Sequence, residues 1–463
     1  MLGELKLEDR SRLRVGIIGS GVAGSAVAYF LHKSLGDRVE IVVHEKESRI
    51  GGRIQRLKLG EEEWEAGGSI IHSENQYLSR IVDELGLIKK IHVYNNIGMW
   101  DGEAFTFRMG NNKMVTPLKV LFRYGFSLFK VQPLVKDMIQ KLSQIYSLQE
   151  NGESFSDPEA LFNRLGLYSL SQVKGYDYFH KHGISDRFIE EFLNGISRLN
   201  YGQDAKMHGL VNLVSLAGAS FGGYLFAIEG GNSQVCEAML KHSSAIVMKN
   251  SRVTTIRVQD SANRKYIVTT EAGTTEEFDY LFIATPLEKA GISFENIEIE
   301  DKNKVSRPYQ VTNVTYVKGQ LNPSYFGLTK AAQIPANILT RENSNIPFSS
   351  IELCKRDLER GQSVYRIFSR QKLSNQQLQQ LFTERLETTS TVWDAYPVLT
   401  PAKVWPSFVI APGLYYVNAM ESAISTMETE VIASKNAVNL LLAQVAGTPL
   451  RKEWDKGSGT VSQ

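Results

Sequence analysis

Three glycines and one glutamate near the N-terminus have the types and spacing that bind an adenine dinucleotide. Gly19, Gly21 and Gly24 form a Gly-x-Gly-x-x-Gly motif, and Glu45 follows about 20 residues later. The glycines permit a tight turn and a close approach of a pyrophosphate, while a carboxylate at this position accepts hydrogen bonds from ribose hydroxyls. The predicted dinucleotide contacts in this segment are Gly19, Ser20, Gly21, Val22, Ala23, Gly24, Glu45 and Lys46.

The elements that position this motif can be predicted from the surrounding sequence. Residues 15–18 form an apolar run typical of a buried parallel strand, residues 25–31 follow as a helix, and residues 39–43 as a second strand. Because strand, glycines, helix, strand and acid occur in this order, the motif is far more specific than a glycine turn alone. The sequence therefore predicts an α/β fold with a Rossmann-type dinucleotide-binding domain.

Two further glycine pairs indicate which dinucleotide binds. The segments at residues 51–53 and 67–70 resemble those that line FAD in glutathione-reductase-like flavoproteins of the amine oxidase type. Glycine leaves no Cβ between the backbone amides and a phosphate or flavin edge, and an arginine can offset phosphate charge. The resemblance implies FAD as the cofactor. It adds Gly51, Gly52, Arg53, Gly67, Gly68, Ser69 and Ile70 to the expected contacts.

Later segments resemble the remainder of such an FAD domain. The strand beginning at Val253 is similar to the strand that contacts the adenine side, and residues 281–286 resemble the strand that returns the chain to this domain. Residues 413–421 lead into a helix expected over 422–442, whose N-terminal dipole would stabilise negative charge on the reduced flavin. The resemblance adds Val253, Thr285, Glu421 and Ser422 to the expected FAD contacts.

Several chemistries have no support in the sequence. There is no second Gly-x-Gly-x-x-Gly unit for a nicotinamide, and Cys236 and Cys354 form no Cys-x-x-Cys pair. Electrons are therefore expected to come from the substrate and to pass to oxygen. The net charge of +2 and the lack of a long basic run favour no nucleic-acid partner. We predict no metal site and no protein partner.

Three segments resemble one family more closely than the wider flavoprotein class. Residues 65–72, 194–203 and 413–423 are similar to prenylcysteine oxidases, also called prenylcysteine or farnesylcysteine lyases, and the resemblance extends from residue 13 to about residue 442. It implies a small lipophilic substrate, the amino-acid thioether farnesyl- or geranylgeranyl-cysteine. A hydride passes to the flavin, water adds, and cysteine and a prenyl aldehyde are released. Molecular oxygen then reoxidises the flavin and gives hydrogen peroxide.

Three polar residues are candidates for roles in this reaction. His72 ends the segment that reaches the flavin in this architecture, and it is either a polar group beside the ring or a histidine satisfied by a backbone carbonyl. Glu421 either steers the attacking water or caps the following helix. Arg198 either pairs with the substrate carboxylate or has a structural role.

The FAD segments divide the chain into two interleaved units. We expect residues 1–115, 227–300 and 401–450 to form the FAD-binding domain, residues 116–226 and 301–400 an α+β substrate domain, and residues 451–463 a flexible tail. A substrate pocket is expected where the two units meet, because ligand sites favour such interfaces.

Residues 115–146 interleave apolar and basic side chains, which predicts either peripheral membrane contact or packing over the pocket. We expect Pro117 and Pro133 to interrupt any single long helix there. No apolar run has the length of a membrane span, and the charged N-terminus lacks a signal core. A soluble, cytoplasmic protein is expected from the sequence as it stands, or a lysosomal or endomembrane-lumen protein if a signal peptide was trimmed.

Two alternative functions stay open. Another flavin amine oxidase or an isoprenoid desaturase would share the FAD motifs and differ in the insertions. A non-catalytic prenyl-binding escort, like the GDP-dissociation inhibitors, would share the fold without flavin. Glu45, Arg53 and residues 67–69 argue against the escort, because a protein that does not bind FAD has no need for them.

Overall fold

The N-terminal segment forms the strand, turn and helix that the glycine motif predicts. The computed structural model describes residues 12–93, 96–109, 115–218, 223–259, 264–304, 306–357, 359–360 and 362–447. Strand β1 (Leu13–Ile18) leads into a turn and then into α1 (Val22–Leu35), and β2 (Val39–His44) pairs parallel with β1. Gly19 has a φ of +104°, and a Cβ on Gly24 would lie 1.9 Å from the carbonyl oxygen of Gly19. Only glycine allows the helix to approach the turn so closely.

A six-stranded sheet, here called the dinucleotide sheet, contains this unit. Its order is β10 (Ile246–Met248), β2, β1, β14 (Tyr280–Ile283), β22 (Leu414–Tyr416) and β21 (Val409–Ala411). Neighbouring strands run parallel except β21 and β22, which pair antiparallel. Helices α10 (Gln234–His242) and α13 (Met427–Val445) pack against α1. Segments from three distant parts of the sequence therefore build one sheet.

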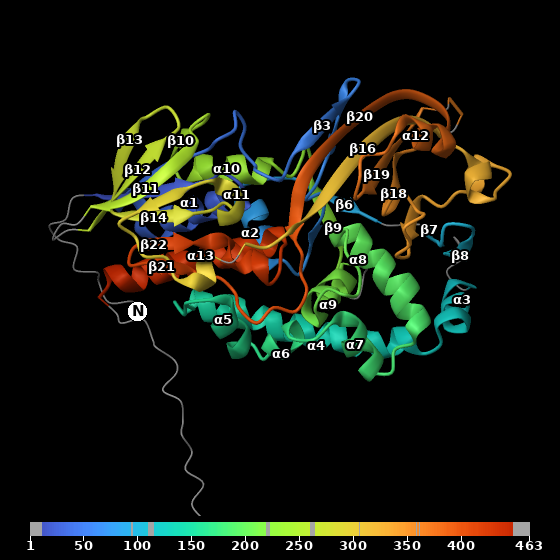
Figure 1. Cartoon of the computed structure of the whole chain (residues 1–463), viewed down its shortest axis with the longest axis horizontal. Coiled ribbons are helices and arrows are strands. Elements are labelled where there is room, and N and C mark those ends of the chain that lie inside the picture. The colour runs from blue at the N-terminus through green and yellow to red at the C-terminus, as the bar shows by residue number, and fades with distance from the viewer. Residues whose placement is uncertain are drawn as a thin grey trace, which may run out of the picture.

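A four-stranded sheet lies beside it, on the left in Figure 1. Its order is β13 (Thr275–Phe278), β12 (Lys265–Thr270), β11 (Val253–Gln259) and β15 (Ser293–Glu295). Two smaller units lie nearer the middle of the molecule in Figure 1. They are the hairpin of β3 (Arg56–Leu59) with β4 (Glu62–Glu65), and the sheet of β5 (Ile71–His72), β9 (Leu225–Ile228) and β6 (Lys89–His92).

The other half contains a seven-stranded sheet, here called the second sheet, on the right in Figure 1. Its order is β20 (Phe382–Pro397), β16 (Tyr309–Leu321), β19 (Ser363–Ser369), β18 (Ser350–Lys355), β17 (Asn337–Thr340), β7 (Ile97–Trp100) and β8 (Phe105–Arg108). The domain boundary predicted at residue 115 differs from the structure, because β7 pairs with β17 and Trp100 is buried in the core of this second half. Local sequence does not reveal such a long-range pairing.

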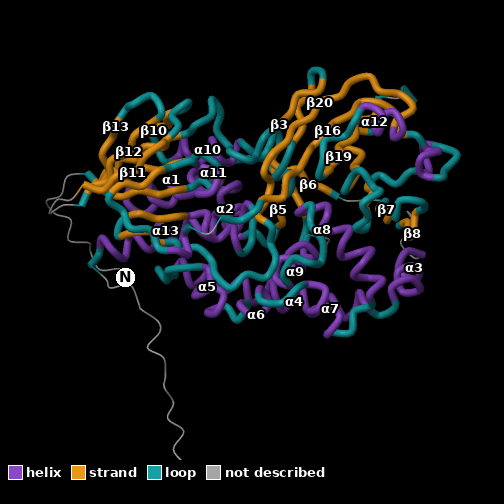
Figure 2. Tube along the Cα trace, viewed as in Figure 1, coloured by secondary structure: helices purple, strands orange, loops and turns teal. Residues whose placement is uncertain are grey.

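Helices line one side of both halves, and they run along the lower edge of Figure 2. They are α3 (Val115–Tyr124), α4 (Ser127–Glu150), α5 (Pro158–Arg164), α6 (Tyr168–Ser171), α7 (Gly175–Lys181), α8 (Asn194–Tyr201) and α9 (Gly209–Ala217). Shorter helices elsewhere are α2 (Gln76–Glu84), α11 (Leu287–Ala290) and α12 (Asn375–Leu381). The helical turns are η1 (Gly36–Arg38), η2 (Phe188–Leu193), η3 (Asp301–Asn303), η4 (Pro323–Phe326), η5 (Ala331–Gln333) and η6 (Val417–Ser422).

Two predicted helix boundaries differ from the structure. Pro133 does not interrupt a helix but lies inside α4, and the break between α3 and α4 falls at residues 125–126 instead. The C-terminal helix begins at Met427 rather than at residue 422. Thr426 is its N-cap, and its hydroxyl accepts a hydrogen bond from the backbone N–H of Thr429 at 3.1 Å.

Some sequence predictions concern features beyond these elements. The tail predicted over 451–463 lies outside the described residues. Within the described ranges, no helix is apolar over a length that would span a bilayer. Both cysteines are free, Cys236 buried in α10 and Cys354 partly exposed in β18.

Candidate active site

A large cavity lies where the two halves and the helical side meet. Its volume is about 660 Å³, and its wall is formed by the glycine turn, β16 and β20 of the second sheet, α4, and the start of α13. The predicted dinucleotide contacts that line it are Gly19, Gly21, Val22, Ala23, Glu45, Lys46, Gly51, Gly52, Arg53, Gly67, Gly68, Ser69, Ile70, Val253 and Thr285. Four other predicted contacts are not part of this wall: Ser20, Gly24, Glu421 and Ser422.

The carboxylate of Glu45 is held in place by the turn between β1 and α1. One carboxylate oxygen accepts hydrogen bonds from the backbone N–H of Ser20 at 2.9 Å and from its hydroxyl at 2.6 Å. The other oxygen accepts a hydrogen bond from the backbone N–H of Glu47 at 2.9 Å. The oxygen that binds Glu47 has a further lone pair, so Glu45 can still accept a hydrogen bond from a ligand hydroxyl. Ser20 therefore acts through Glu45 rather than by lining the cavity.

Two glycine loops meet at the N-terminus of α1. Gly21 is the N-cap of this helix, and no acidic residue lies in its first turn. A Cβ on Gly52 would lie 3.1 Å from the Cα of Gly21, so a side chain here would crowd the neighbouring loop. The first backbone amides of α1 lie at the cavity wall together with this loop, which is the arrangement that favours a pyrophosphate.

Gly67 also serves the packing of the two halves. A Cβ on Gly67 would lie 2.3 Å from the indole ring of Trp393, which belongs to β20. The loop after β4 therefore lies directly against the second sheet. Close packing against Trp393 is therefore one reason for a glycine at position 67. The expected access of a flavin to the backbone is another.

Arg53 forms an ion pair with Glu421. Its Nη1 donates to the Glu421 carboxylate and also to the carbonyl oxygen of Ala395 at 3.0 Å. Glu421 accepts further hydrogen bonds from Asn418 Nδ2 at 3.1 Å and from the Ser425 hydroxyl at 3.3 Å. Burial disfavours the Arg53 cation, but the charge and hydrogen bond of Glu421, together with the charge of Glu430, outweigh burial and raise the arginine pKa.

This ion pair changes two of the predicted roles. Glu421 is 1% exposed and does not line the cavity, so it is not placed to steer a water molecule there. It does not cap the helix either, because Thr426 is the N-cap of α13. Arg53 still lines the cavity, but Glu421 already compensates part of its charge.

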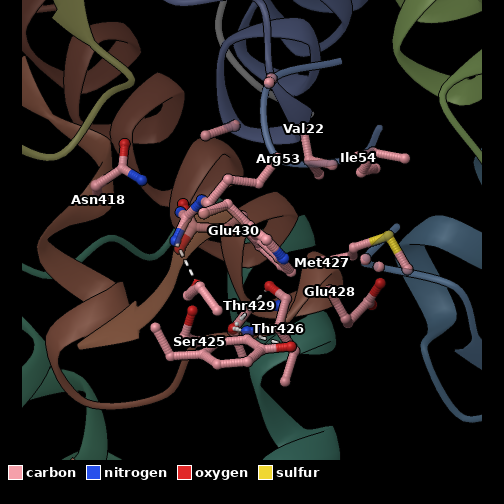
Figure 3. Close-up of a pocket in the computed structure, with 18 of the residues that line it drawn as sticks. Val22, Arg53, Ile54, Asn418, Ser425, Thr426, Met427, Glu428, Thr429 and Glu430 are labelled. Carbon is pink, nitrogen blue, oxygen red and sulfur yellow. Dashed lines mark hydrogen bonds between the residues drawn. The ribbon is translucent and has the colours of Figure 1, made fainter. Parts of the chain in front are cut away.

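Glu430 lies in the first turn of α13 with no hydrogen-bond partner for either carboxylate oxygen among the described residues. Its side chain lines the cavity, and Figure 3 shows it close to Arg53. Burial and repulsion from Glu421 raise the pKa of Glu430 well above its ordinary value. A buried carboxylate without donors is costly, so this position indicates a ligand that supplies hydrogen-bond donors.

The neighbouring Glu428 joins three helices. It accepts hydrogen bonds from the backbone N–H groups of Tyr77 and Leu78 at 2.8 and 3.0 Å, and from the Tyr146 hydroxyl at 2.8 Å. Tyr77 and Leu78 lie in the first turn of α2, and Tyr146 lies in α4. Burial raises the pKa of the Glu428 carboxyl to about 7 despite these donors.

Part of the cavity wall is apolar. Most of its residues come from helices α4, α8 and α9. Helices α4 and α8 both pack against α9, so side chains from distant segments meet here. We call this group the apolar wall. Its residues are Met138, Ile139, Leu142, Leu199, Val214, Ala217 and Leu225.

The other two candidate residues also line the cavity. His72 lies on β5, and its Nδ1 accepts a hydrogen bond from the backbone N–H of Glu74 at 3.1 Å. Arg198 is 4% exposed, and its guanidinium donates to Thr340 Oγ1 at 3.0 Å, to Glu342, and to the carbonyl oxygen of Phe348 at 3.3 Å. Of the two roles predicted for Arg198, these partners favour the structural one over binding of the substrate carboxylate.

A pair of opposite charges was not predicted. Lys289 of α11 and Asp394 of β20 both line the cavity, with Nζ and Oδ2 2.9 Å apart. Their side chains are 44% and 41% exposed, so both remain accessible to a ligand. Lys289 Nζ also lies 5.2 Å from the ring centre of Tyr309. A neighbouring cation and anion can bind the carboxylate and ammonium groups of an amino acid.

A comparison with known families identifies this architecture. Residues 107–451 match the family model described as prenylcysteine lyase, which is more than half of the chain. The chain belongs to the prenylcysteine lyase family. Residues 17–85 match the model of an NAD(P)-binding Rossmann-like domain. The family resemblance and the Rossmann-type fold predicted from the sequence are thereby confirmed.

Individual proteins agree with this assignment. Farnesylcysteine lyase of Arabidopsis thaliana is 32% identical, over 98% of this chain and 92% of that protein. Human prenylcysteine oxidase 1 is also 32% identical, over 92% of this chain and 88% of that protein. Among solved structures, putrescine oxidase with bound putrescine superposes with a TM-score of 0.60 at 15% identity, covering 93% of this chain and 99% of that one. This last likeness shows the shared fold.

In this prenylcysteine lyase family member, sequence reasoning missed the residues at the start of α13. Ser425, Thr426 and Met427 line the cavity, whereas the predicted contacts Glu421 and Ser422 do not. The error follows from the predicted helix start at residue 422. The spacing of Thr426 and Thr429 is the sequence signal that could have located the true N-cap, because each side chain can bond to the backbone of the other.

Proposed function

We propose that this protein is an FAD-dependent oxidase that cleaves the thioether of farnesyl- or geranylgeranyl-cysteine. One molecule each of substrate, oxygen and water yields cysteine, a prenyl aldehyde and hydrogen peroxide. The observation that carries the proposal is that one cavity contains both the dinucleotide contacts and the apolar wall. Membership of the prenylcysteine lyase family supports the same substrate class.

The residues present fit FAD. Glu45 would hold the adenosine ribose, and the amides at the start of α1 and the Gly51–Gly52 turn would hold the pyrophosphate. The hydroxyls of the ribityl chain would supply the hydrogen-bond donors that the Glu430 carboxyl group lacks. Bound here, FAD would supply the two-electron oxidation of the carbon next to sulfur and return the electrons to oxygen.

The chain itself contributes binding, orientation and exclusion of water. The apolar wall would hold the prenyl group and keep bulk water from the carbon that is oxidised. Lys289 and Asp394 would bind the amino-acid end of the substrate through its carboxylate and ammonium groups. Sulfur and the adjacent double bond both activate the reacting carbon, so the reaction requires no strong protein base. This agrees with the partners found for Glu421 and Arg198.

The deciding experiment is an anaerobic titration of the purified protein. We expect an oxidised flavin spectrum that bleaches when farnesylcysteine is added, with farnesal and cysteine as products, and peroxide after oxygen is admitted. The matched control is putrescine, a diamine that should leave the spectrum unchanged. A flavin that bleaches only with amines or isoprenoid alkenes would identify another oxidase or a desaturase, and a protein that cannot bind flavin would favour the escort function.

A further inference from the structure

A cluster of apolar side chains is exposed at the end of the molecule formed by α3 and the start of α4, at the lower right in Figure 1. We call this cluster the apolar tip. Large apolar residues are ordinary on a surface when they are scattered, but five within twelve residues form a patch that marks an interaction site. Its members and their exposed fractions are Leu118 67%, Leu121 37%, Phe122 94%, Phe126 69% and Phe129 63%.

A basic groove opens beside the apolar tip. Its volume is about 300 Å³, and Phe122 forms part of its wall. The cationic residues among its lining are Arg108, Lys119, Arg123 and Arg187. Arg123 donates to both carboxylate oxygens of Glu191 at 2.8 and 2.6 Å. The other three have no carboxylate within ion-pair distance among the residues that the structure describes.

The acidic residues nearest to Arg187 in the sequence are Asp186 and Glu190. Asp186 Oδ1 accepts a hydrogen bond from the Tyr176 hydroxyl at 2.9 Å. The same oxygen lies 3.0 Å from Nδ1 of His180. Neither acid lines the groove, so the groove itself presents an excess of positive charge. Guanidinium groups bind phosphate through parallel hydrogen bonds, and exposed aromatic side chains insert between lipid headgroups.

We propose that the apolar tip and the basic groove together bind the surface of a bilayer that contains anionic phospholipid. The phenylalanines and leucines enter the interface while the groove binds a headgroup phosphate. This narrows the membrane contact predicted over 115–146 to its first half, because Met138, Leu142 and Tyr146 line the cavity instead.

The position of the apolar tip suggests that membrane contact serves substrate uptake. This step rests on the proposed function. Helix α4 begins next to Phe126 and carries Leu142 of the apolar wall further along. Thirteen residues separate Phe129 from Leu142, or roughly 20 Å of helix. The surface that would contact the bilayer and the cavity that would take a lipophilic thioether therefore share a single helix.

The test is sedimentation of the FAD-loaded protein with vesicles in the absence of substrate. We expect binding to vesicles of phosphatidylcholine mixed with phosphatidylserine, weaker binding to phosphatidylcholine alone, and loss of the difference at high salt. Arg108→Gln with Arg187→Gln should lower the partition coefficient about fivefold for each cation removed. Phe122→Ser with Phe126→Ser should lower binding to both kinds of vesicle, because it removes the inserted apolar side chains.

A matched control replaces exposed apolar residues on another surface. Leu386→Ser and Val392→Ser on β20 are 47% and 61% exposed in the native protein and should leave vesicle binding unchanged. Lack of vesicle binding by the native protein, or an equal loss in this control, would overturn the proposal. If the native protein is a dimer and the phenylalanine variants are monomers, the apolar tip binds a second copy of the chain instead, and the proposal is overturned.

The outcome can be separated from that of the proposed function. None of the substituted residues lines the cavity, so each variant should keep its flavin spectrum and its turnover of farnesylcysteine in solution without vesicles. Vesicle binding without turnover would refute the proposed function alone. Turnover without vesicle binding would refute the membrane contact alone.

Discussion

Ser20 donates two hydrogen bonds to one carboxylate oxygen of Glu45, from its backbone N–H at 2.9 Å and from its hydroxyl at 2.6 Å. Glu45 comes from the end of β2 and Ser20 from the turn after β1, so these bonds connect two neighbouring strands at the edge of the cavity. The carboxylate is therefore oriented before any ligand binds. Such preorganisation reduces the entropy that a ligand must lose on binding.

Glu45→Ala should weaken FAD binding by about 10- to 100-fold, because hydrogen bonds to a charged group are lost. Ser20→Ala should have a smaller effect, since it removes only one of the three bonds that orient the carboxylate. Both dissociation constants can be measured from the quenching of flavin fluorescence when apoprotein is titrated. Native affinity in the Glu45→Ala variant would exclude the predicted ribose contact.

Glu430→Leu should change two properties in opposite directions. The apoprotein should become more stable, because a buried carboxylate without partners is replaced by an apolar side chain of similar size. FAD affinity should fall, because the acceptor for the ribityl hydroxyls is lost. Glu430→Gln keeps an acceptor oxygen and should retain most of the affinity. Urea unfolding and flavin titration measure the two effects, and equal affinities for the two variants would contradict the proposed contact.

Glu428 should make the stability of the protein depend on pH. Burial raises the pKa of its carboxyl from 4.5 to about 7 in the folded protein. The folded state therefore binds this proton more tightly than the unfolded state. Its contribution to the free energy of unfolding is full below pH 4.5 and falls by roughly 3 kcal/mol as the pH rises to about 7. Urea unfolding at pH 5 and pH 8 should show a fall in the native protein that is smaller by this amount in Glu428→Gln, where Glu430 still contributes.

Arg53→Met should destabilise the protein by about 3 kcal/mol, because it leaves the buried carboxylate of Glu421 without its cation. The double variant Arg53→Met with Glu421→Gln should be more stable than Arg53→Met alone, since the uncompensated charge is then absent. Denaturant midpoints of the apoproteins provide the comparison. Additive effects of the two substitutions would show that the ion pair contributes little.

Leu142→Trp should reduce the space at the apolar wall and select for the shorter prenyl group. We expect kcat/KM for geranylgeranylcysteine to fall roughly tenfold more than that for farnesylcysteine, within the range for changes of hydrocarbon size in a pocket. Gln140→Trp is the matched control, because this residue is exposed on the same helix. Parallel changes for both substrates would place the prenyl group elsewhere in the cavity.

Features encoded by neighbouring residues could be predicted, and features that depend on distant partners could not. The turn at Gly19 and the strand that ends at His44 follow from local glycine spacing and apolar runs. The role of Arg198 was left open because its partner Glu342 lies 144 residues away in the sequence. The Lys289–Asp394 pair was missed for the same reason. The start of α13 is different, since its capping residues are local and were overlooked.

The contact of Gly67 with the Trp393 ring has a consequence for how the molecule can move. A side chain can change rotamer to relieve a close contact, but a backbone position has no such freedom. The loop after β4 therefore lies against the Trp393 ring with no room for a side chain at position 67. Any movement of this loop toward the second sheet would therefore have to displace the Trp393 ring.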